Sequence, residues 1–385
     1  MQDSASEHTF LTDSFELPPQ QTRLQEFWIQ LRKNRLALMG LVIFLVFFVI
    51  ALTGRLLTFG RSPLLDPSMV RLQEKLRPPL SRPNMESLLP EEMPPMGVYL
   101  LGTDELGRDV FARMLQGAWV SLSVGFVAVG IAVFIGILLG GLAGYYGQNP
   151  IRVGEVLIAV LVIWMALGWG KLSTLILVVL ALAVIAIAAV LVVQRNSDSR
   201  GLLHVFSAHF LSVDMVITGL IDIMLCFPSF FLILTVVALL PASIYNIMIV
   251  IGITSWMGAA RFVRAEFLSL REQDFVAAAR ALGVPDWRII FRHMVPNAIA
   301  PVLVSATIGI AGAILTEAGL SFLGFGVPPP DATWGNILSD GKNYLFDAPW
   351  LTFIPGIAIL VVVLSFNLFG EGLRDILNPK LRERH

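Results

Sequence analysis

The sequence predicts an all-α polytopic membrane protein, and three observations support this fold class. Of its 385 residues, 56% are hydrophobic and only 14% are charged. The mean hydropathy of +0.76 is far from the balance of a soluble domain. Apolar runs long enough to cross a bilayer recur along the chain, separated by polar segments. The net charge of −1 provides no global basic field, so we expect no binding to nucleic acid.

The first 35 residues are expected to form a cytoplasmic tail. They lack the basic start and short apolar core of a cleaved signal peptide. Basic residues from Arg32 to Arg35 precede the first apolar run, 36–53, and the positive-inside rule places them in the cytoplasm. We therefore predict an uncleaved first span. It is followed by an external segment, 54–117, which is rich in proline and expected to be mostly irregular.

The end of the external segment carries helix-forming signals. Thr103 or Asp104 is expected to cap a short amphipathic helix lying at the membrane interface. A second span follows, from about 118 to 146, and its glycines would let neighbouring helices approach closely. Two more apolar runs, 153–168 and 173–193, then predict a hairpin of two helices, which leaves the orientation of the later spans unchanged.

The third span begins near Asp214 and contains two residues that are unusual in a membrane. Pro228 is expected to kink the helix. Asp222 either lies near the membrane surface, pairs with a neighbouring helix, or takes part in a transport pathway. A short fourth span is expected at 244–259.

Charge distribution orients the last two spans, which we place at about 298–315 and 351–369. The segment between them carries Lys342 as its only basic residue, which fits an external location. The tail, 371–385, is rich in basic residues and is expected in the cytoplasm.

A polar, arginine-rich stretch, 261–296, separates the fourth and fifth spans. We predict two short helices with a corner between them, because Gly283 can adopt the left-handed conformation that ends a helix. Pro285 suits the first turn of the next helix. Residues at helical spacing are expected to form one face of the first helix: Phe275, Ala278, Ala279 and Leu282. An ordinary positive cytoplasmic loop is the alternative interpretation.

The stretch resembles the EAA loop of ABC-importer permeases, in which a coupling helix docks into a groove of the ATPase subunit. The matching positions are Ala278, Ala279, Gly283 and Pro296. Two positions depart from the pattern, since the glutamate of the motif falls at Ala277 and the leucine before the proline is Val295. Asp274 lies one helical turn before Ala277 and is included among the candidate coupling residues.

A second stretch, GTDELGRDV at 102–110, closely resembles the segment before the second span in the C-type subunit of dipeptide and oligopeptide permeases. Short matches after residue 316 also follow that pattern, including Trp334-Gly335. The resemblance covers about 23–147 and 212–379. Residues 148–211 therefore look like an insertion within the permease core, 118–370.

The resemblance implies a bacterial inner-membrane permease with six family spans plus a two-helix insertion. Its partners would be a second permease subunit in a heterodimer, two cytoplasmic ATPases and an external solute-binding protein, besides membrane lipid. ATP and magnesium would bind to the ATPases, and no cofactor or metal to this chain. Such a complex imports peptides by alternating access.

Candidate site residues fall into three groups. The ATPase-coupling group is Asp274, Ala278, Ala279, Gly283 and Pro296. The pathway or helix-packing group is Asp222 and Pro228. The group for contact with an external partner is Asp104, Arg108, Glu317 and Trp334, although Glu317 could equally be a surface carboxylate at a helix end.

The sequence carries no signal of an enzyme. Gly170-Lys171 is not a phosphate loop, because Met165 replaces the first glycine and Leu172 replaces the Ser or Thr. The five histidines are scattered without metal-ligand spacing. Two alternative functions stay open: an importer of nickel or another small solute, and a stand-alone secondary transporter. The second should show paired repeats and its own ion site, and no internal repeat is evident.

Reporter fusions test the predicted topology. A reporter fused after Arg200 should report the cytoplasm, and one fused within 320–350 should report the external side, because of the distribution of basic residues. The measurement is the activity of a paired cytoplasmic and external reporter. An external signal at residue 200 would contradict the two-helix hairpin.

Overall fold

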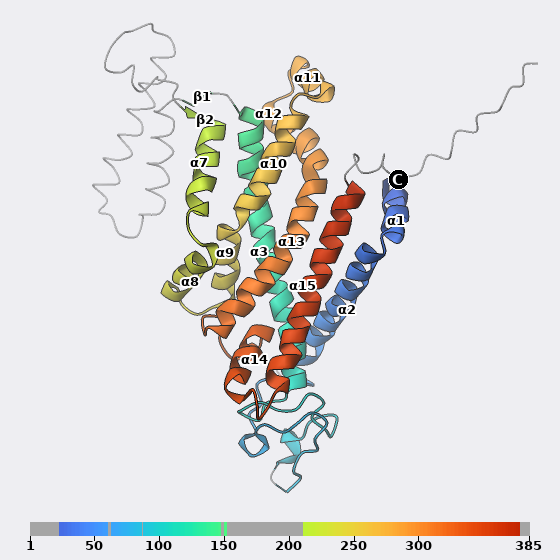
Figure 1. Cartoon of the computed structure of the whole chain (residues 1–385), viewed down its shortest axis with the longest axis vertical. Helices are drawn as coiled ribbons and strands as arrows, with labels where there is room; N and C mark the ends of the chain where they lie inside the picture. The colour runs from blue at the N-terminus through green and yellow to red at the C-terminus, as the bar shows by residue number, and fades with distance from the viewer. Residues whose placement is uncertain (1–22, 61–62, 87, 148–149, 152–210, 378–385) are drawn as a thin grey trace, which may run out of the picture.

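The computed structural model describes residues 23–60, 63–86, 88–147, 150–151 and 211–377. Long helices run between two ends of the molecule (Figure 1). The loop that joins α2 (Arg35–Thr58) to α3 (Val110–Tyr146) lies at one end with the helix α14 (Trp334–Gly341), and α11 (Asp274–Ala281) lies at the other (Figure 1). The two described chain ends, in α1 (Arg23–Lys33) and α15 (Trp350–Leu377), lie toward the α11 end (Figure 1).

The helices of the first half are α1 (Arg23–Lys33), α2 (Arg35–Thr58), α3 (Val110–Tyr146), α7 (Val213–Leu225) and α8 (Ser229–Leu239). Those of the second half are α9 (Ile244–Thr254), α10 (Trp256–Leu270), α11 (Asp274–Ala281), α12 (Asp286–Arg288), α13 (Val295–Phe322), α14 (Trp334–Gly341) and α15 (Trp350–Leu377). A π-helical turn, η3 (Ile289–Met294), joins α12 to α13. Short 3₁₀ turns are η1 (Leu72–Glu74), η2 (Pro90–Glu92) and η4 (Lys342–Tyr344).

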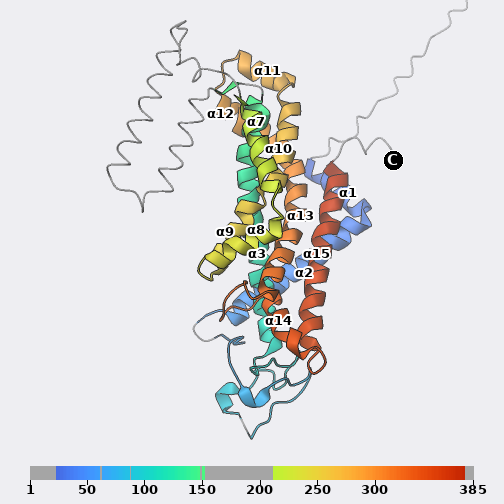
Figure 2. The same ribbon diagram turned by 60° about the vertical axis from the view of Figure 1, so that its left-hand side comes forward.

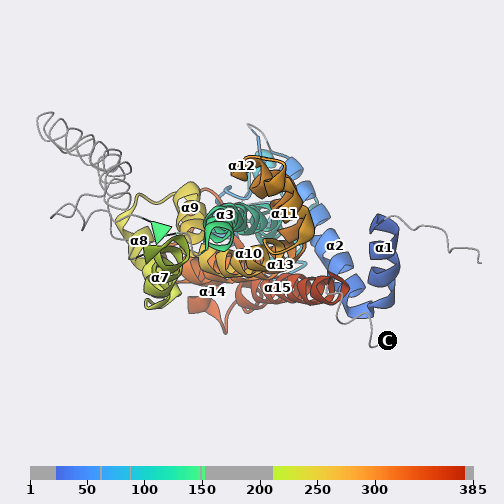
Figure 3. The ribbon, with the colours of Figure 1, turned by 90° about the horizontal axis from the view of Figure 1, so that it is seen from above.

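Within the described residues, five helical segments are long and apolar enough to cross a membrane, and the bent pair α7–α8 makes up to six. The predicted all-α polytopic fold is therefore confirmed. Seen from above, α7 and α8 lie on one side of the bundle and α1 and α2 on the other (Figure 3). Buried residues of α3, α9, α13 and α15 form the largest core cluster, for example Val124, Ile251, Ile314 and Val362.

The predicted short helix before the second span is wrong. Instead, α3 begins at Val110 and continues without a break to Tyr146. Its cap is Asp109, whose carboxylate accepts a hydrogen bond from the N–H of Phe111 at 2.8 Å. The chain before it cannot be helical, because Gly107 has a φ of +71°. Thr103 and Asp104 thus belong to the preceding turn rather than to a helix cap.

Glycines bring α3 close to α10, as the sequence predicts. A β-carbon at Gly140 would lie 2.4 Å from the carbonyl oxygen of Ala260, and one at Gly144 would lie 2.4 Å from Cβ of Phe267. At Gly136 it would lie 2.5 Å from Cβ of Ala259. Larger residues would push the two helices apart, as expected for small-residue packing in membranes.

The kink predicted at Pro228 is confirmed, and it is a complete break. Helices α7 and α8 meet at an angle of 81° (Figure 2). Pro228 stands directly before the first residue of α8, where its missing N–H costs no helical hydrogen bond. Ile233 and Val237 of α8 are buried against the bundle.

The helix that carries the fourth span continues beyond the predicted range, 244–259. After an irregular residue at Ser255 it runs on as α10 to Leu270, and the whole segment Ile244–Leu270 is long and apolar enough to cross a membrane. Two arginines of α10 pair with carboxylates of α7: Arg264 with Asp214, and Arg261 with Asp222.

Most of the predicted insertion, 148–211, lies outside the described residues, and so does its predicted hairpin. Its two flanks are described. Strands β1 (Pro150–Ile151) and β2 (Leu211–Ser212) pair antiparallel, with Pro150 opposite Ser212. The chain therefore leaves α3 and returns to α7 at the same place.

The paired flanks predict that the insertion can be removed. Replacing residues 152–210 by Asn-Gly should close β1 and β2 into a two-residue hairpin. The shortened protein should still co-purify with the second permease subunit that the resemblance implies. A deletion of 152–214 is the control, because it also removes Asp214 and its pairing with Arg264. Complete loss of the second subunit from the 152–210 deletion would show that the insertion is needed for assembly.

Candidate functional site

The corner between α11 and α12, residues 282–285, has the structure that the sequence predicts. Gly283 has a φ of +73° and follows α11. Its N–H donates to the carbonyl of Arg280 at 2.9 Å, and the N–H of Val284 donates to the carbonyl of Ala279 at 3.1 Å. Pro285 then precedes α12. These bonds satisfy the last carbonyls of α11, as a glycine helix terminus does.

The predicted face of α11 is divided between the interior and the surface. Val276 and Ala279 are buried in a cluster with Phe267 and Ile289. Phe275, Ala278 and Leu282 lie at the surface. The expectation that Ala279 belongs to the exposed contact face is therefore wrong, because this alanine packs inside its own chain.

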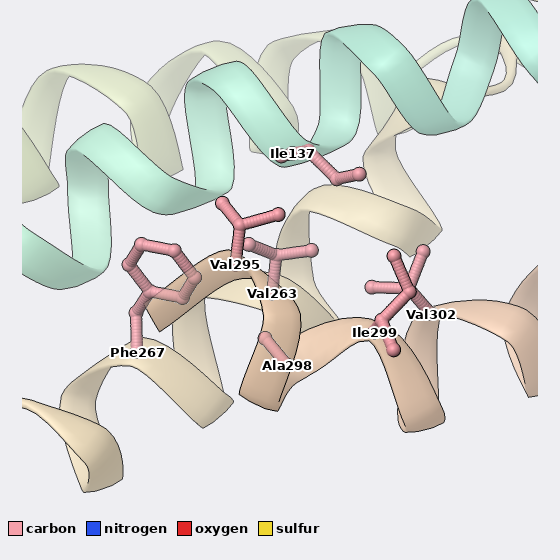
Figure 4. A pocket seen from close by; sticks show the side chains of 7 residues that line it. All are labelled: Ile137, Val263, Phe267, Val295, Ala298, Ile299 and Val302. Carbon is pink, nitrogen blue, oxygen red and sulfur yellow. The ribbon is translucent and has the colours of Figure 1, made fainter. Parts of the chain in front are cut away.

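Below the corner, the helices are packed tightly. Figure 4 shows a small apolar pocket to which α3, α10 and α13 contribute side chains. It holds no room for water and is lined by Ile137, Val263, Phe267, Val295, Ala298, Ile299 and Val302. Since Phe267 and Val263 also belong to the cluster that buries Ala279, the corner is supported by a continuous apolar core.

The corner exposes large apolar side chains that no other described part of the chain covers. Leu282 is 82% exposed and Trp287 is 59% exposed. Phe291 follows on the π-helical turn and is also exposed. Aromatic and aliphatic side chains gathered at a protruding tip indicate a surface that binds another protein.

Asp274 and Pro296 delimit this region. Asp274 stands in the first turn of α11, where a carboxylate interacts favourably with the helix dipole. Pro296 is the second residue of α13 and is exposed. The Asp274 carboxylate has no side-chain hydrogen bond or ion pair within the described part of the chain.

A hydrogen bond and a cation–π contact, which the sequence did not indicate, join the corner to the end of α3. The hydroxyl of Tyr145 donates to Asp286 at 2.6 Å. The Arg280 guanidinium lies 5.0 Å from the centroid of the Tyr145 ring. The pattern gave no signal of this contact, because 141 residues separate Tyr145 from Asp286.

Asp222 lies on α7 and pairs with Arg261 of α10 at 3.1 Å, and its side chain is 70% exposed. The pairing with a neighbouring helix matches one of the alternatives that the sequence left open. An exposed pair of this kind contributes little to stability.

At the opposite end, Asp104 organises the segment before α3. Its side chain is fully buried and lies 2.6 Å from Arg113 and 2.7 Å from Arg108. It also accepts the N–H groups of Leu106 and Arg108 at 2.9 Å each. Arg113 and Arg108 also reach Asp340 in the last turn of α14, at 2.9 and 3.1 Å. Four charges thus bind two segments that are far apart in the sequence.

Glu317 and Trp334 form a second buried polar cluster at this end. Glu317 accepts hydrogen bonds from Ser321 at 2.7 Å and Ser121 at 3.2 Å, and none of its surface is exposed. Trp334 is 1% exposed, and its ring N–H donates to the carbonyl of Met114 at 3.2 Å. The cluster fastens α14 to α3 and α13.

These positions correct the predicted contacts with an external partner. Asp104, Glu317 and Trp334 are buried within the chain, so they cannot touch a partner in this structure. The surface alternative for Glu317 is wrong for the same reason. Arg108 keeps 15% of its side chain exposed, although both ends of its guanidinium are engaged by carboxylates.

Burial also changes the acidity of two groups near Asp104. It raises the pKa of the Asp109 carboxyl above its ordinary value, and the N–H groups of Phe111 and Ala112 partly oppose this effect. Burial raises the pKa of Tyr99 to about 12. The phenol of Tyr99 is therefore neutral at physiological pH.

Comparison with known proteins finds two matching family profiles. The profile of the binding-protein-dependent transport system inner membrane component matches residues 202–383. The profile of the N-terminal transmembrane domain of oligopeptide transport permease C matches residues 22–79. Relatives align over nearly the whole chain, the first at 36% identity across 93% of it. The chain belongs to the binding-protein-dependent permease family.

Similar permeases come from several bacteria. The dipeptide transport system permease protein DppC of Alkalihalophilus pseudofirmus is 36% identical over 358 residues, which cover 90% of that protein. DppC of Haemophilus influenzae is 32% identical, with 94% of this chain and 96% of the relative covered. The oligopeptide transport system permease protein OppC of Bacillus subtilis is 30% identical, with 92% and 89% covered.

Family membership fixes the general role of the chain. It is a membrane-embedded transport subunit of an ABC importer and not itself an enzyme. The stand-alone secondary transporter, the alternative from another class, is incorrect because the chain belongs to this permease family.

Replacing Asp104 tests the buried charge cluster of this permease. Asp104→Ala should destabilise the protein by about 3–5 kcal/mol, because Arg113 is left buried with an incomplete set of carboxylates. The measurement is thermal unfolding of the purified complex in detergent. Glu91→Ala, at an exposed position of the same external segment, is the control and should change stability by less than about 0.5 kcal/mol. Equal stability of both variants would contradict the assigned role of Asp104.

Proposed function

We propose that this chain is a permease subunit of a peptide importer. The relatives that align over most of its length carry the names of dipeptide and oligopeptide permeases, and this favours peptides over nickel or another small solute. The chain would pair with a second permease subunit to form the path through the membrane. An external binding protein would deliver the peptide.

The proposal assigns the helical corner to the contact with a cytoplasmic ATPase. The observation that carries it is the apolar tip around Gly283, where Leu282 and Trp287 are exposed although the residues beneath them are well packed. A tip with this support would transmit force as a rigid body. Phe275, Ala278 and Phe291 extend the same apolar surface. Asp274 and Pro296 would lie at its edges.

The two ATPases would bind ATP and magnesium, and this chain would respond by moving. Tyr145 links the corner to α3 through its hydrogen bond to Asp286. A displacement of the corner would therefore reach α3, which extends to the charge cluster at the opposite end of the molecule. This arrangement suits alternating access, since both ends of the path must change together.

We place the chain in the bacterial inner membrane with both termini in the cytoplasm. The described ends of the chain, in α1 and α15, lie toward the α11 end (Figure 1). Basic residues accompany them, with Arg32 and Lys33 in the last turn of α1 and Arg374 in the last turn of α15. The positive-inside rule supports this orientation.

Substitution of Gly283 tests the coupling role. Gly283→Leu should fold and insert, because no atom lies within 4 Å of the added β-carbon, although the left-handed backbone costs about 1 kcal/mol or more. It should lose either ATPase binding or ATPase stimulation, since a bulky side chain blocks the corner. Ala278→Asp should act likewise by placing a charge in the contact. The measurements are co-purification of the ATPase and its activity in reconstituted vesicles, with and without loaded binding protein.

Gly97→Leu is the matched control for backbone strain. Gly97 has a φ of +69° and equally open surroundings, and it lies in the segment at the opposite end of the molecule. This variant should retain ATPase binding. Wild-type stimulation in both Gly283→Leu and Ala278→Asp would refute the assignment of the corner as the coupling element.

A further inference from the structure

A cavity of about 620 Å³ lies between α10, α13 and α15. It is near the α11 end, because Glu266 comes from the last turns of α10, Asn297 from the first turn of α13 and Arg374 from the last turn of α15. Its volume is in the range of binding sites for small molecules, about 300–1,000 Å³.

The cavity has a charge of each sign on different helices. Glu266 is half-buried and projects from α10, whereas Arg374 is exposed and projects from α15. Neither forms an ion pair with any described residue. The nearby arginines of α10 differ, since Arg261 and Arg264 both have carboxylate partners on α7.

Apolar side chains line the space around these charges. Phe262, Pro301 and Ile308 are among them, and the exposed lining is mainly apolar. Such a surface accepts side chains of different shapes without demanding a specific hydrogen bond. The cavity therefore combines a carboxylate, a guanidinium and an unselective apolar wall.

We propose that this cavity binds a short peptide with free termini on its way to the cytoplasm. Glu266 pairs with the α-ammonium group, and Arg374 binds the α-carboxylate through its planar guanidinium. The apolar wall accepts the peptide side chains. This proposal rests on the proposed function and adds the residues that recognise the substrate class.

Other occupants would use only part of this chemistry. An anionic lipid headgroup would engage Arg374 and be repelled by Glu266. A divalent cation would engage Glu266 and be repelled by Arg374. A zwitterion satisfies both charges at once, and a peptide with uncapped ends does so while its side chains contact the apolar wall.

Direct binding tests the proposal without the binding protein. The assembled permease–ATPase complex in lipid nanodiscs is incubated with radiolabelled Ala-Phe. Equilibrium binding is measured up to about 10 mM, so that a Kd in the millimolar range is detected. Competition by unlabelled Ala-Phe should be at least about tenfold stronger than competition by Ala-Phe capped at both ends, since the capped peptide loses both charge pairs.

Variants identify the residues. Glu266→Gln and Arg374→Gln should each weaken binding of Ala-Phe about tenfold, the effect of removing one charge-assisted contact. The double exchange Glu266→Arg with Arg374→Glu should recover binding, because the peptide can bind in the opposite orientation and pair each terminus with a residue of opposite charge. Glu371→Gln is the control, since Glu371 is exposed on α15 about one turn before Arg374 and does not line the cavity. Thermal unfolding and co-purification of the partners verify that each variant is assembled.

Three results would overturn the proposal: no binding of Ala-Phe to the wild type, equal competition by the capped peptide, or unchanged binding in both single variants. The last result would identify the cavity as a packing surface, for example for the second permease subunit. Binding-protein-dependent uptake of Ala-Phe by the wild-type complex is measured in parallel. Uptake with unchanged binding in the variants refutes this site alone, whereas the absence of uptake of any tested peptide refutes the proposed function.

Discussion

Close contact between α3 and α10 is the constraint on which the rest of the structure depends. Glycines of α3 let the backbone of α10 approach so closely that a single added methyl group at Gly140 would collide with a carbonyl oxygen. In lipid, helices associate largely through such close van der Waals packing, because the hydrophobic effect that folds soluble proteins does not act between them. Because α10 leads directly into the corner and α3 ends at Tyr145 beside it, this contact also determines where the corner stands.

Helix α3 also connects the two ends of the molecule. Its 37 residues correspond to a length of about 55 Å at 1.5 Å per residue. Arg113 near its start shares carboxylates with Asp104 and Asp340, and Tyr145 near its end holds Asp286. A single helix therefore contacts both the segment that precedes it and the corner. Distances between the ends are set by one helix rather than by a chain of loops.

Local signals in the sequence were sufficient for much of this architecture. The left-handed glycine at the corner and the break at Pro228 follow from the conformations that these residues favour, and both were predicted. The sequence could not show which side chains meet after folding. Glu317 and Trp334 looked like surface residues because their partners on α3 lie 196 and 220 residues away. Asp104 pairs with arginines only four and nine residues away, but its burial was not evident from the local pattern. The continuation of the fourth helix to Leu270 was missed, and its arginines pair with carboxylates on another helix.

The break between α7 and α8 has a consequence for what surrounds it. Cys226 ends α7 and Pro228 precedes α8, and Phe227 and Pro228 are exposed on the single chain. Hydrocarbon offers no hydrogen bonds to backbone groups without a partner, so irregular backbone at membrane depth is stable only against protein or in a water-filled space. At membrane depth a break of this kind needs protein or water beside it, so the α7–α8 break indicates a side of the subunit that lipid tails alone do not cover.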